Sequence, residues 1–241
     1  MKRERLDKVL ANMALGTRKE VKQLVKQGII TVDGEVATDP GMHVVPEIQT
    51  IEIDGHPLSY KRWIYVMMNK PPGVISATED TRHRTVVDLL PLEWATKVHP
   101  VGRLDIDTEG LLLLTNDGQL SHSLLSPKKK VDKEYFARIE GRVTSEHVEH
   151  FRRGVTLDDG YQTMPASLEI ITQGETSEVR VTITEGKFHQ VKRMFAAFDL
   201  QVVYLKRLRM GALHLDDSLA PGEFRELTEE ELAALRGDSR E

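Results

Sequence analysis

The sequence predicts an α+β protein that consists of a small basic N-terminal module and a larger domain rich in β-strands. Its 241 residues exceed what a single small module requires and can bury a substantial core. Helical periodicity and short alternating strands share the first 60 residues, whereas most later segments have the two-residue period of strands. We therefore expect domains at residues 1–58 and 63–241, joined by a hydrophilic linker at residues 59–62.

The N-terminal module is expected to contain two helices and a small sheet. Apolar residues with helical spacing occur at Leu6, Val9, Leu10 and Met13. Thr17 and Glu20 have the spacing of a capping box, which predicts the start of a second helix, and Gly28 is suited to end it. Residues 29–36 then predict two strands joined by an Asp-Gly turn, and residues 51–53 predict a third strand.

The second domain is expected to be mainly β-structure with a few helices. Strand-like segments occur at residues 63–68, 98–105, 111–115, 135–140, 166–171, 178–184 and 202–208. Helical periodicity occurs at residues 119–125, 145–154, 190–198 and 228–235. Pro71 and Pro72 force the first of these strands to leave the sheet, because proline cannot donate a ladder hydrogen bond.

The composition excludes several classes of protein. With 39% hydrophobic and 29% charged residues and a mean hydropathy of −0.36, the chain differs from disordered, collagenous and membrane proteins. It has no apolar run of about 18 residues, and we expect neither a membrane span nor a secretory signal. The absence of cysteine excludes disulfides, thiolate nucleophiles and cysteine zinc sites, and favours a cytoplasmic location.

The net charge of −5 conceals two basic segments. Residues 1–30 and residues 186–209 each carry a net charge of +5, whereas residues 216–241 carry −6. A chain with local cationic patches can bind a polyanion selectively without being basic as a whole, since each neutralised phosphate releases counterions. These patches favour a nucleic acid as the partner.

The N-terminal residues resemble a known RNA-binding module. The segments from Arg5 to Ala11 and from Thr17 to Gly34 are similar to the S-four type module of ribosomal and RNA-modifying proteins. This resemblance implies that the outer face of the second helix, with Arg18, Lys19, Lys22 and Lys26, docks onto structured RNA, and that Arg5 assists.

The segment from Gly102 to Gly118 places Asp105 and Asp107 just before four consecutive leucines. A calcium loop of the EF-hand type is excluded, because its twelfth position requires a bidentate glutamate and is Asn116 here. A glycosidase pair is excluded as well, since neighbours at i and i+2 do not hold two carboxylates across a sugar. We therefore expect no metal site here.

Three further motifs accompany this segment: Asn69-Lys70-Pro71-Pro72-Gly73, Lys133-Glu134-Tyr135, and the residues from Glu185 to Met194. Together the four segments resemble the pseudouridine synthase family, in particular the branch that acts on small-subunit ribosomal RNA. The resemblance extends over nearly the whole chain. It implies a catalytic domain with a large mixed, mostly antiparallel sheet and an active cleft that crosses it.

The resemblance also implies a reaction and its residues. Uridine is isomerised to pseudouridine without a cofactor, and the catalytic aspartate maps onto Asp105. This carboxylate either attacks the anomeric carbon or removes the neighbouring sugar proton, and the sequence leaves both open. A cation should keep it ionised: Lys192 is the first candidate and Arg103 the second, as a guanidinium that holds the turn and the carboxylate together. Tyr135 is expected to stack on the base and to assist the late proton transfer.

Further RNA contacts are expected near the target uridine, at Lys70, His189, Gln190, Arg193, Lys206, Arg207 and Arg209. The expected partner is small-subunit ribosomal RNA or its assembling ribonucleoprotein particle, and the expected state is a monomer. Two alternatives remain open at this point: a synthase that acts on large-subunit ribosomal RNA or tRNA, and a non-catalytic binding factor in ribosome assembly.

Overall fold

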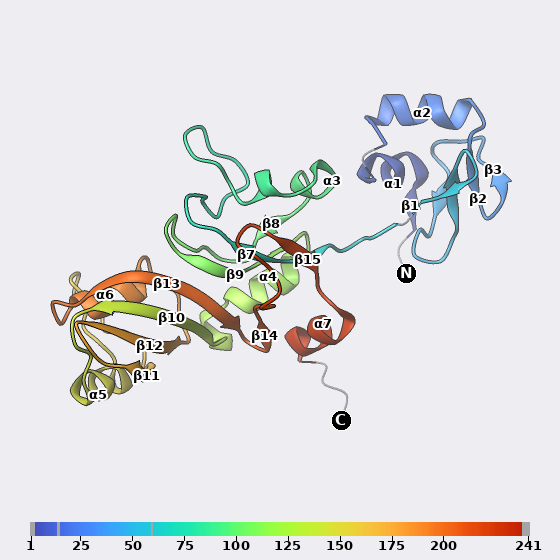
Figure 1. Ribbon diagram of the computed structural model, residues 1–241. Coiled ribbons are helices and arrows are strands. Elements are labelled where there is room, and N and C mark those ends of the chain that lie inside the picture. Colours follow the sequence, from blue (N-terminus) through green and yellow to red (C-terminus); the bar gives the residue numbers. More distant parts are fainter. Residues whose placement is uncertain (1–2, 14, 59, 238–241) are drawn as a thin grey trace. The chain divides into compact units, whose positions relative to one another are not determined.

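The computed structural model describes residues 3–13, 15–58 and 60–237, which form two compact units, Met1–Trp63 and Ile64–Glu241 (Figure 1). The second unit thus begins one residue later than the sequence suggests, and residues 60–62 of the expected linker belong to the first unit. Residue 59 of that linker, and residues 1–2, 14 and 238–241 of the expected domains, lie outside the described residues.

Unit 1 contains the two expected helices, α1 (Leu6–Asn12) and α2 (Arg18–Lys26). Its strands are β1 (Glu4–Arg5), β2 (Ile30–Val32), β3 (Glu35–Val36), β4 (His43–Val44), β5 (Ile51–Ile53) and β6 (His56–Pro57). The capping box of α2 is present, and positive φ angles at Asp33 and Gly34 close the turn between β2 and β3. The sequence analysis misses β1 and β4, because strands of two residues carry no periodic pattern, and it overlooks the Asp54-Gly55 turn that joins β5 to β6.

Unit 2 is built around one large sheet. Its strands are β7 (Tyr65–Lys70), β8 (His99–Pro100), β9 (Glu109–Thr115), β10 (Lys133–Glu140), β11 (Ser167–Thr172), β12 (Thr176–Ile183), β13 (Gln201–Met210), β14 (Leu213–His214) and β15 (Phe224–Glu226). The main order is β11-β12-β10-β13-β9-β7-β15, with β8 beside β9 and β14 beside β13. Only β9 and β13 pair in parallel, so the described sheet is mixed and mostly antiparallel, as expected.

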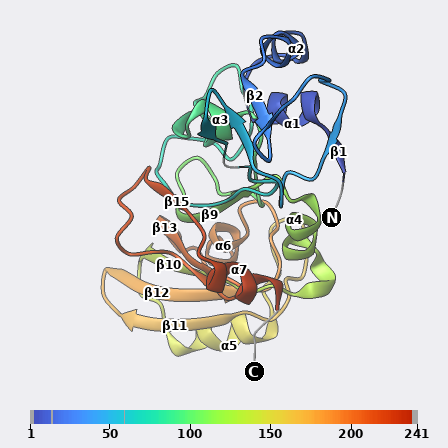
Figure 2. The same cartoon turned by 90° about the vertical axis from the view of Figure 1, so that its right-hand side faces the viewer.

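Helices cover both faces of this sheet. They are α3 (Leu92–Ala95), α4 (Gly118–Leu125), α5 (Ser145–Arg153), α6 (Gln190–Ala196) and α7 (Glu229–Arg236), with short 3₁₀ helices at Val87–Leu89 and Pro127–Lys129. Helix α5 lies beside β11, in yellow and orange (Figure 2). On one face, Leu112 and Leu114 share a core with residues of α5 and α6, whereas Leu111 and Leu113 pack with α4 on the other. Burial on both faces explains the unbroken leucine run.

The expected strand at residues 98–105 is wrong beyond its first residues. Only His99 and Pro100 pair, as β8, and the chain then forms a loop of residues 101–108, which we call the Asp105 loop. Gly102 has a φ of +78°, and the amide of Thr108 donates to the carbonyl oxygen of Asp105 at 3.1 Å. Because of this turn, residues 102–108 do not pair with a neighbouring strand.

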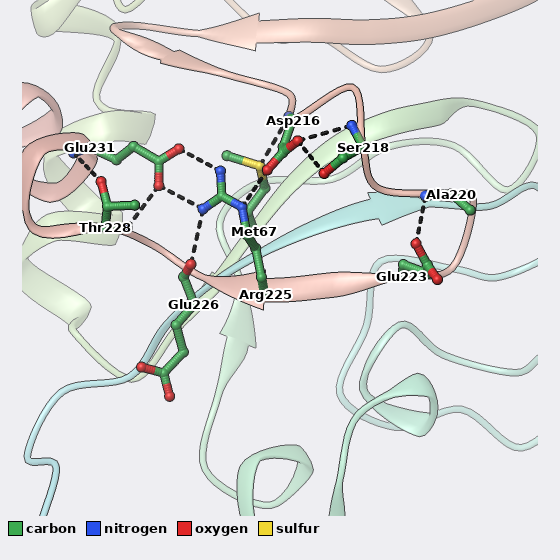
Figure 3. A network of polar contacts seen from close by, with 9 residues as sticks. All are labelled: Met67, Asp216, Ser218, Ala220, Glu223, Arg225, Glu226, Thr228 and Glu231. Carbon is green, nitrogen blue, oxygen red and sulfur yellow. Dashed lines mark hydrogen bonds and ion pairs between the residues drawn. The ribbon is translucent and has the colours of Figure 1, made fainter.

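Arg225 connects β15, α7 and the segment that precedes β15 (Figure 3). Its guanidinium donates to both carboxylate oxygens of Glu231 at 2.8 and 2.7 Å, and its Nε donates to Asp216 at 2.6 Å. Hydrogen bonds from Ser218 and Arg225 lower the pKa of Asp216 to about 2, and Arg225 lowers the pKa of Glu231. The network fastens the C-terminal helix to the edge of the sheet.

Replacing Arg225 with methionine should make the protein unfold at a higher pH in an acid titration followed by circular dichroism. A carboxylate with a depressed pKa stabilises the folded state above its ordinary pKa of 3.8, and this contribution is lost as the pH falls toward 2. Without Arg225 the folded-state pKa lies closer to 3.8 and this contribution is smaller, so the variant reaches its unfolding midpoint at a higher pH. Arg152→Met, which removes an exposed arginine paired with Glu149, is the control. Identical acid midpoints for the two variants would contradict the assigned role.

Candidate active site

Lys70, the last residue of β7, lies beneath the Asp105 loop. The side chain is completely buried, and its Nζ donates to the carbonyl oxygens of Thr108 at 2.8 Å, Asp105 at 3.0 Å and Pro71 at 3.1 Å. Burial lowers its pKa to about 8, against the pull of nearby carboxylates. Lys70 therefore fixes the loop from within. Its expected contact with RNA is wrong, because the ammonium group does not reach the surface.

Ser76 holds the same loop from the side. Its hydroxyl accepts a hydrogen bond from the amide of Leu104 and donates one to the carbonyl oxygen of Leu104, both at 3.0 Å. The amide of Gly73 donates to the carbonyl oxygen of Ile106 at 2.7 Å. The backbone on either side of Asp105 is thus fastened to residues that follow β7.

Gly110 allows the loop to enter the centre of the sheet. It pairs with Lys70 on β7 and with Arg207 on β13, and its φ is +98°. A Cβ atom at this position would lie 2.3 Å from the carbonyl oxygen of Arg207. Only glycine permits this close approach of the two strands, which fixes the start of β9 and the loop before it.

Two side chains from the start of α6 lie beside the carboxylate of Asp105. The Nζ of Lys192 is 3.3 Å from Oδ2 of Asp105, and Nε2 of His189 is 3.6 Å from Oδ1. The Asp105 side chain is 26% exposed, so its carboxylate remains accessible although Lys192 lies beside it. The sequence prediction that Lys192 lies beside Asp105 is therefore correct in its geometry.

Lys192 also contacts Asp107, a residue that the sequence reasoning left without a role. Its Nζ donates to Oδ1 of Asp107 at 2.6 Å. Burial acts to raise the pKa of Asp107, but the hydrogen bond and the charge of Lys192 outweigh it, and the pKa is lowered. Lys192 thus lies between two carboxylates of one loop.

The turn before α6 is fastened by the buried pair Glu185 and Gln190. Glu185 accepts hydrogen bonds from the hydroxyl of Tyr161 at 2.7 Å, from the amide of Met164 at 2.8 Å and from the side-chain amide of Gln190 at 2.9 Å. The side-chain oxygen of Gln190 accepts from the amide of Lys187 at 2.9 Å. The expected RNA contact of Gln190 is therefore wrong: the side chain is buried and positions the turn.

Several other expected RNA contacts are engaged within the protein. Arg207 is buried and donates to the carbonyl oxygen of Leu111 at 2.7 Å, so its expected contact is wrong. Arg193 is paired with Asp158 and Asp159, and Arg209 donates to Glu134 and to the carbonyl oxygen of Gly211. Lys206 is half-buried. The three basic residues of β13 therefore do not form one exposed cluster.

Of the two other expected catalytic residues, Arg103 is exposed to solvent and Tyr135 is buried. Arg103 is exposed, and its guanidinium makes no hydrogen bond or ion pair with any residue that the structure describes. It does not hold the turn as expected; Lys70 does. Tyr135, on β10, is buried in the same core cluster as Leu104, the residue before Asp105.

In unit 1 the expected cationic face is present. The side chains of Arg18, Lys19, Lys22 and Lys26 on α2 are exposed. Arg5 is half-exposed and donates to both carboxylate oxygens of Asp7 at 3.1 and 2.9 Å. The α2 face is thus free to meet a polyanion, whereas the charge of Arg5 is already compensated.

Replacing Lys70 with methionine should lower turnover by about 10- to 100-fold, because small displacements of reacting groups cost this much. RNA affinity should hardly change, since the side chain is buried. The free energy of unfolding of the wild type should also rise relative to the variant between pH 8 and 10.5, where the unfolded chain retains the proton that folded Lys70 loses. Turnover, RNA binding and urea unfolding at several pH values test this.

Lys97→Met is the matched control, because Lys97 is a half-buried lysine that makes no hydrogen bond to the Asp105 loop. Equal turnover of the two variants would show that the ammonium group of Lys70 does not position the loop.

Over residues 3–13, 15–58 and 60–237, no helix is long and apolar enough to cross a membrane. Within the same residues, no group of three or more histidine, cysteine, aspartate or glutamate side chains is arranged to hold a metal ion.

Comparisons with known proteins identify the family of the chain. Residues 64–197 match the family described as RNA pseudouridylate synthase, and residues 4–47 match the S4 domain. The chain is 54% identical to an uncharacterized RNA pseudouridine synthase, YtzG, of Bacillus subtilis, over 96% of this chain and 98% of that protein. It is 43% identical to ribosomal small subunit pseudouridine synthase A of Escherichia coli, over 96% of this chain and 99% of that protein.

A solved structure described as a pseudouridylate synthase shares the fold, with a TM-score of 0.69 and 35% identity, over 98% of this chain and 100% of that one. The family match covers more than half of the chain, and the relatives span nearly all of it. The chain belongs to the RNA pseudouridylate synthase family and carries an N-terminal S-four type RNA-binding domain.

Proposed function

We propose that this enzyme isomerises a specific uridine of small-subunit ribosomal RNA to pseudouridine, with Asp105 as its catalytic carboxylate. The observation that carries the proposal is the position of Asp105 on a loop fixed by Lys70 and Ser76, with Lys192 at 3.3 Å from its carboxylate. The choice of RNA is supported by the name of the Escherichia coli relative, ribosomal small subunit pseudouridine synthase A.

The proposed reaction breaks the bond between N1 of uracil and the ribose, rotates the base, and joins carbon five to the sugar. Asp105 either attacks the anomeric carbon or removes the neighbouring sugar proton, and both roles require an ionised carboxylate. The charge of Lys192 favours that state. The proton of carbon five leaves and N1 gains one, so the product is an isomer and no cofactor is consumed. We assign two roles to Tyr135: its ring stacks on the base, and its hydroxyl assists the late proton transfer.

The target uridine must leave its stack before Asp105 can reach the sugar, at a cost of a few kcal/mol. RNA contacts elsewhere must offset this cost. The exposed cations of α2 are suited to bind a remote part of the RNA, and the exposed Arg103 is suited to contact RNA two residues from Asp105. Binding by unit 1 would raise the local concentration of the target at unit 2.

We further propose that the enzyme acts in the cytoplasm as a monomer. The absence of cysteine is consistent with a reducing compartment, and the sequence has no heptad pattern that would indicate a coiled-coil partner. Sedimentation of the purified protein would test the oligomeric state.

Tritium release from RNA labelled at carbon five of uridine tests the function. The wild type should release tritium from small-subunit ribosomal RNA, either naked or within an assembling particle, and should release none from large-subunit ribosomal RNA or tRNA. Release from one of those other RNAs alone would correct the substrate. Binding without release from any RNA would instead indicate a binding factor in ribosome assembly.

A further inference from the structure

Phe188 is a large aromatic side chain that the fold leaves exposed. It is 72% exposed, and one face of its ring is stacked on the ring of His189, with 3.7 Å between the centroids and 19° between the planes. A single exposed apolar residue is common on protein surfaces, so the position and the rigidity of this ring decide whether it can serve as a binding surface. The other face of the Phe188 ring has no such cover among the ring contacts of the described residues.

The stacked pair borders the proposed catalytic carboxylate. Nε2 of His189 lies 3.6 Å from Oδ1 of Asp105. The stacked pair is therefore next to the position that the reacting sugar must occupy. Ile106, the residue after Asp105, is also partly exposed, at 40%. The exposed apolar surface of this region thus adjoins the reacting group.

The turn that carries the pair is held rigidly. Glu185 and Gln190 fasten it from the buried side, and Nη1 of Arg193 lies 3.5 Å from the carbonyl oxygen of Phe188, to which it donates. His189 has a φ of +49°, a left-handed conformation that is unfavourable for a residue with a side chain. A strained residue fixed by buried contacts keeps the Phe188 ring in one place, as a preorganised binding surface requires.

We propose that Phe188 and His189 form a stacking platform for the base of a nucleotide next to the target uridine, an inference that rests on the proposed function. When the target uridine leaves its stack, it uncovers the faces of its neighbours. A flat aromatic surface beside the carboxylate replaces that lost stacking. The exposed Lys187 provides positive charge for an adjoining phosphate. This charge favours RNA over an apolar protein segment as the occupant.

The test combines changes in the protein with changes in the RNA. The uridine modified by the wild type is mapped, and short RNAs are prepared with either neighbouring nucleotide replaced by an abasic residue. Phe188→Leu should weaken single-turnover efficiency on intact RNA by roughly 5- to 150-fold, the size expected for one base–aromatic stack. The same variant should lose little further on the RNA that lacks the stacked base. Phe188→Trp should restore the efficiency on intact RNA.

Leu92→Ala is the matched control, because Leu92 is also a large exposed apolar residue, at 78% exposure, and should leave all rates unchanged. Melting temperatures verify that each variant is folded. Full efficiency of Phe188→Leu on intact RNA would overturn the platform, as would an equal loss on intact and both abasic RNAs. These results leave the proposed function standing. A wild type that modifies no RNA would overturn the proposed function itself and the platform with it.

Discussion

Asp105→Asn should lower single-turnover pseudouridine formation by roughly 10³-fold or more, the loss typical of removing a group that acts on the reacting atoms. The amide has the shape of the carboxylate but neither its charge nor its basicity, so it can neither attack the sugar nor remove a proton. The affinity for RNA should stay within a few-fold of the wild type, because the cationic face of α2 is unchanged. Tritium release at saturating RNA and fluorescence anisotropy with labelled RNA measure the two quantities.

Asp107→Asn is the matched control for this variant. It removes the same charge from the same loop, and from a side chain that also contacts Lys192, at 2.6 Å. Because Asp107 is 66% exposed and only Asp105 is assigned to the reacting sugar, its loss should cost far less turnover. Equal losses for the two variants would indicate that the loop needs its total negative charge. Substantial turnover by Asp105→Asn would refute the assigned carboxylate.

The sequence predicts most of the fold, because the helices and long strands have local signals. The capping box at Thr17 and Glu20 and the leucine run in β9 are examples, and both elements lie where expected. The largest error falls where pairing is decided by distant residues. The expected strand before Asp105 becomes a loop because Lys70 and Ser76 bind its backbone, and no local pattern records such contacts.

In the candidate site, the sequence predicts which residues come together but not which of them are buried. The motifs correctly place Lys192 beside Asp105, although 87 positions separate them in the chain. Charge alone, however, does not distinguish an exposed cation from a buried one. Arg207 and Lys70 were expected to bind RNA, but each is buried and bonded to backbone carbonyl oxygens. Phe188 was overlooked, since a phenylalanine in a basic motif gives no sign in the sequence that it is exposed.

The second large effect is expected from the cationic face of α2. Replacing Arg18, Lys19, Lys22 and Lys26 with glutamine should weaken RNA binding by about 10²-fold or more at physiological salt. The plot of log affinity against log salt should become less steep by about 3, since each lost phosphate contact contributes roughly 0.7–0.9. Turnover at saturating RNA should stay near that of the wild type, because Asp105 and Lys192 belong to the other unit.

Glutamine is a good helix former, and the capping box at Thr17 is untouched, so α2 itself should remain folded. Two double variants, each lacking two positive charges, show whether the position of the lost charges matters or only their number. Lys19 and Lys22 are replaced together in one variant, and Arg152 and Arg153 on α5 in another. The α5 pair is exposed but already accompanied by Glu149, so its loss should hardly change the salt dependence. Equal slopes for the two variants would mean that RNA responds to overall charge and that α2 is not its docking face.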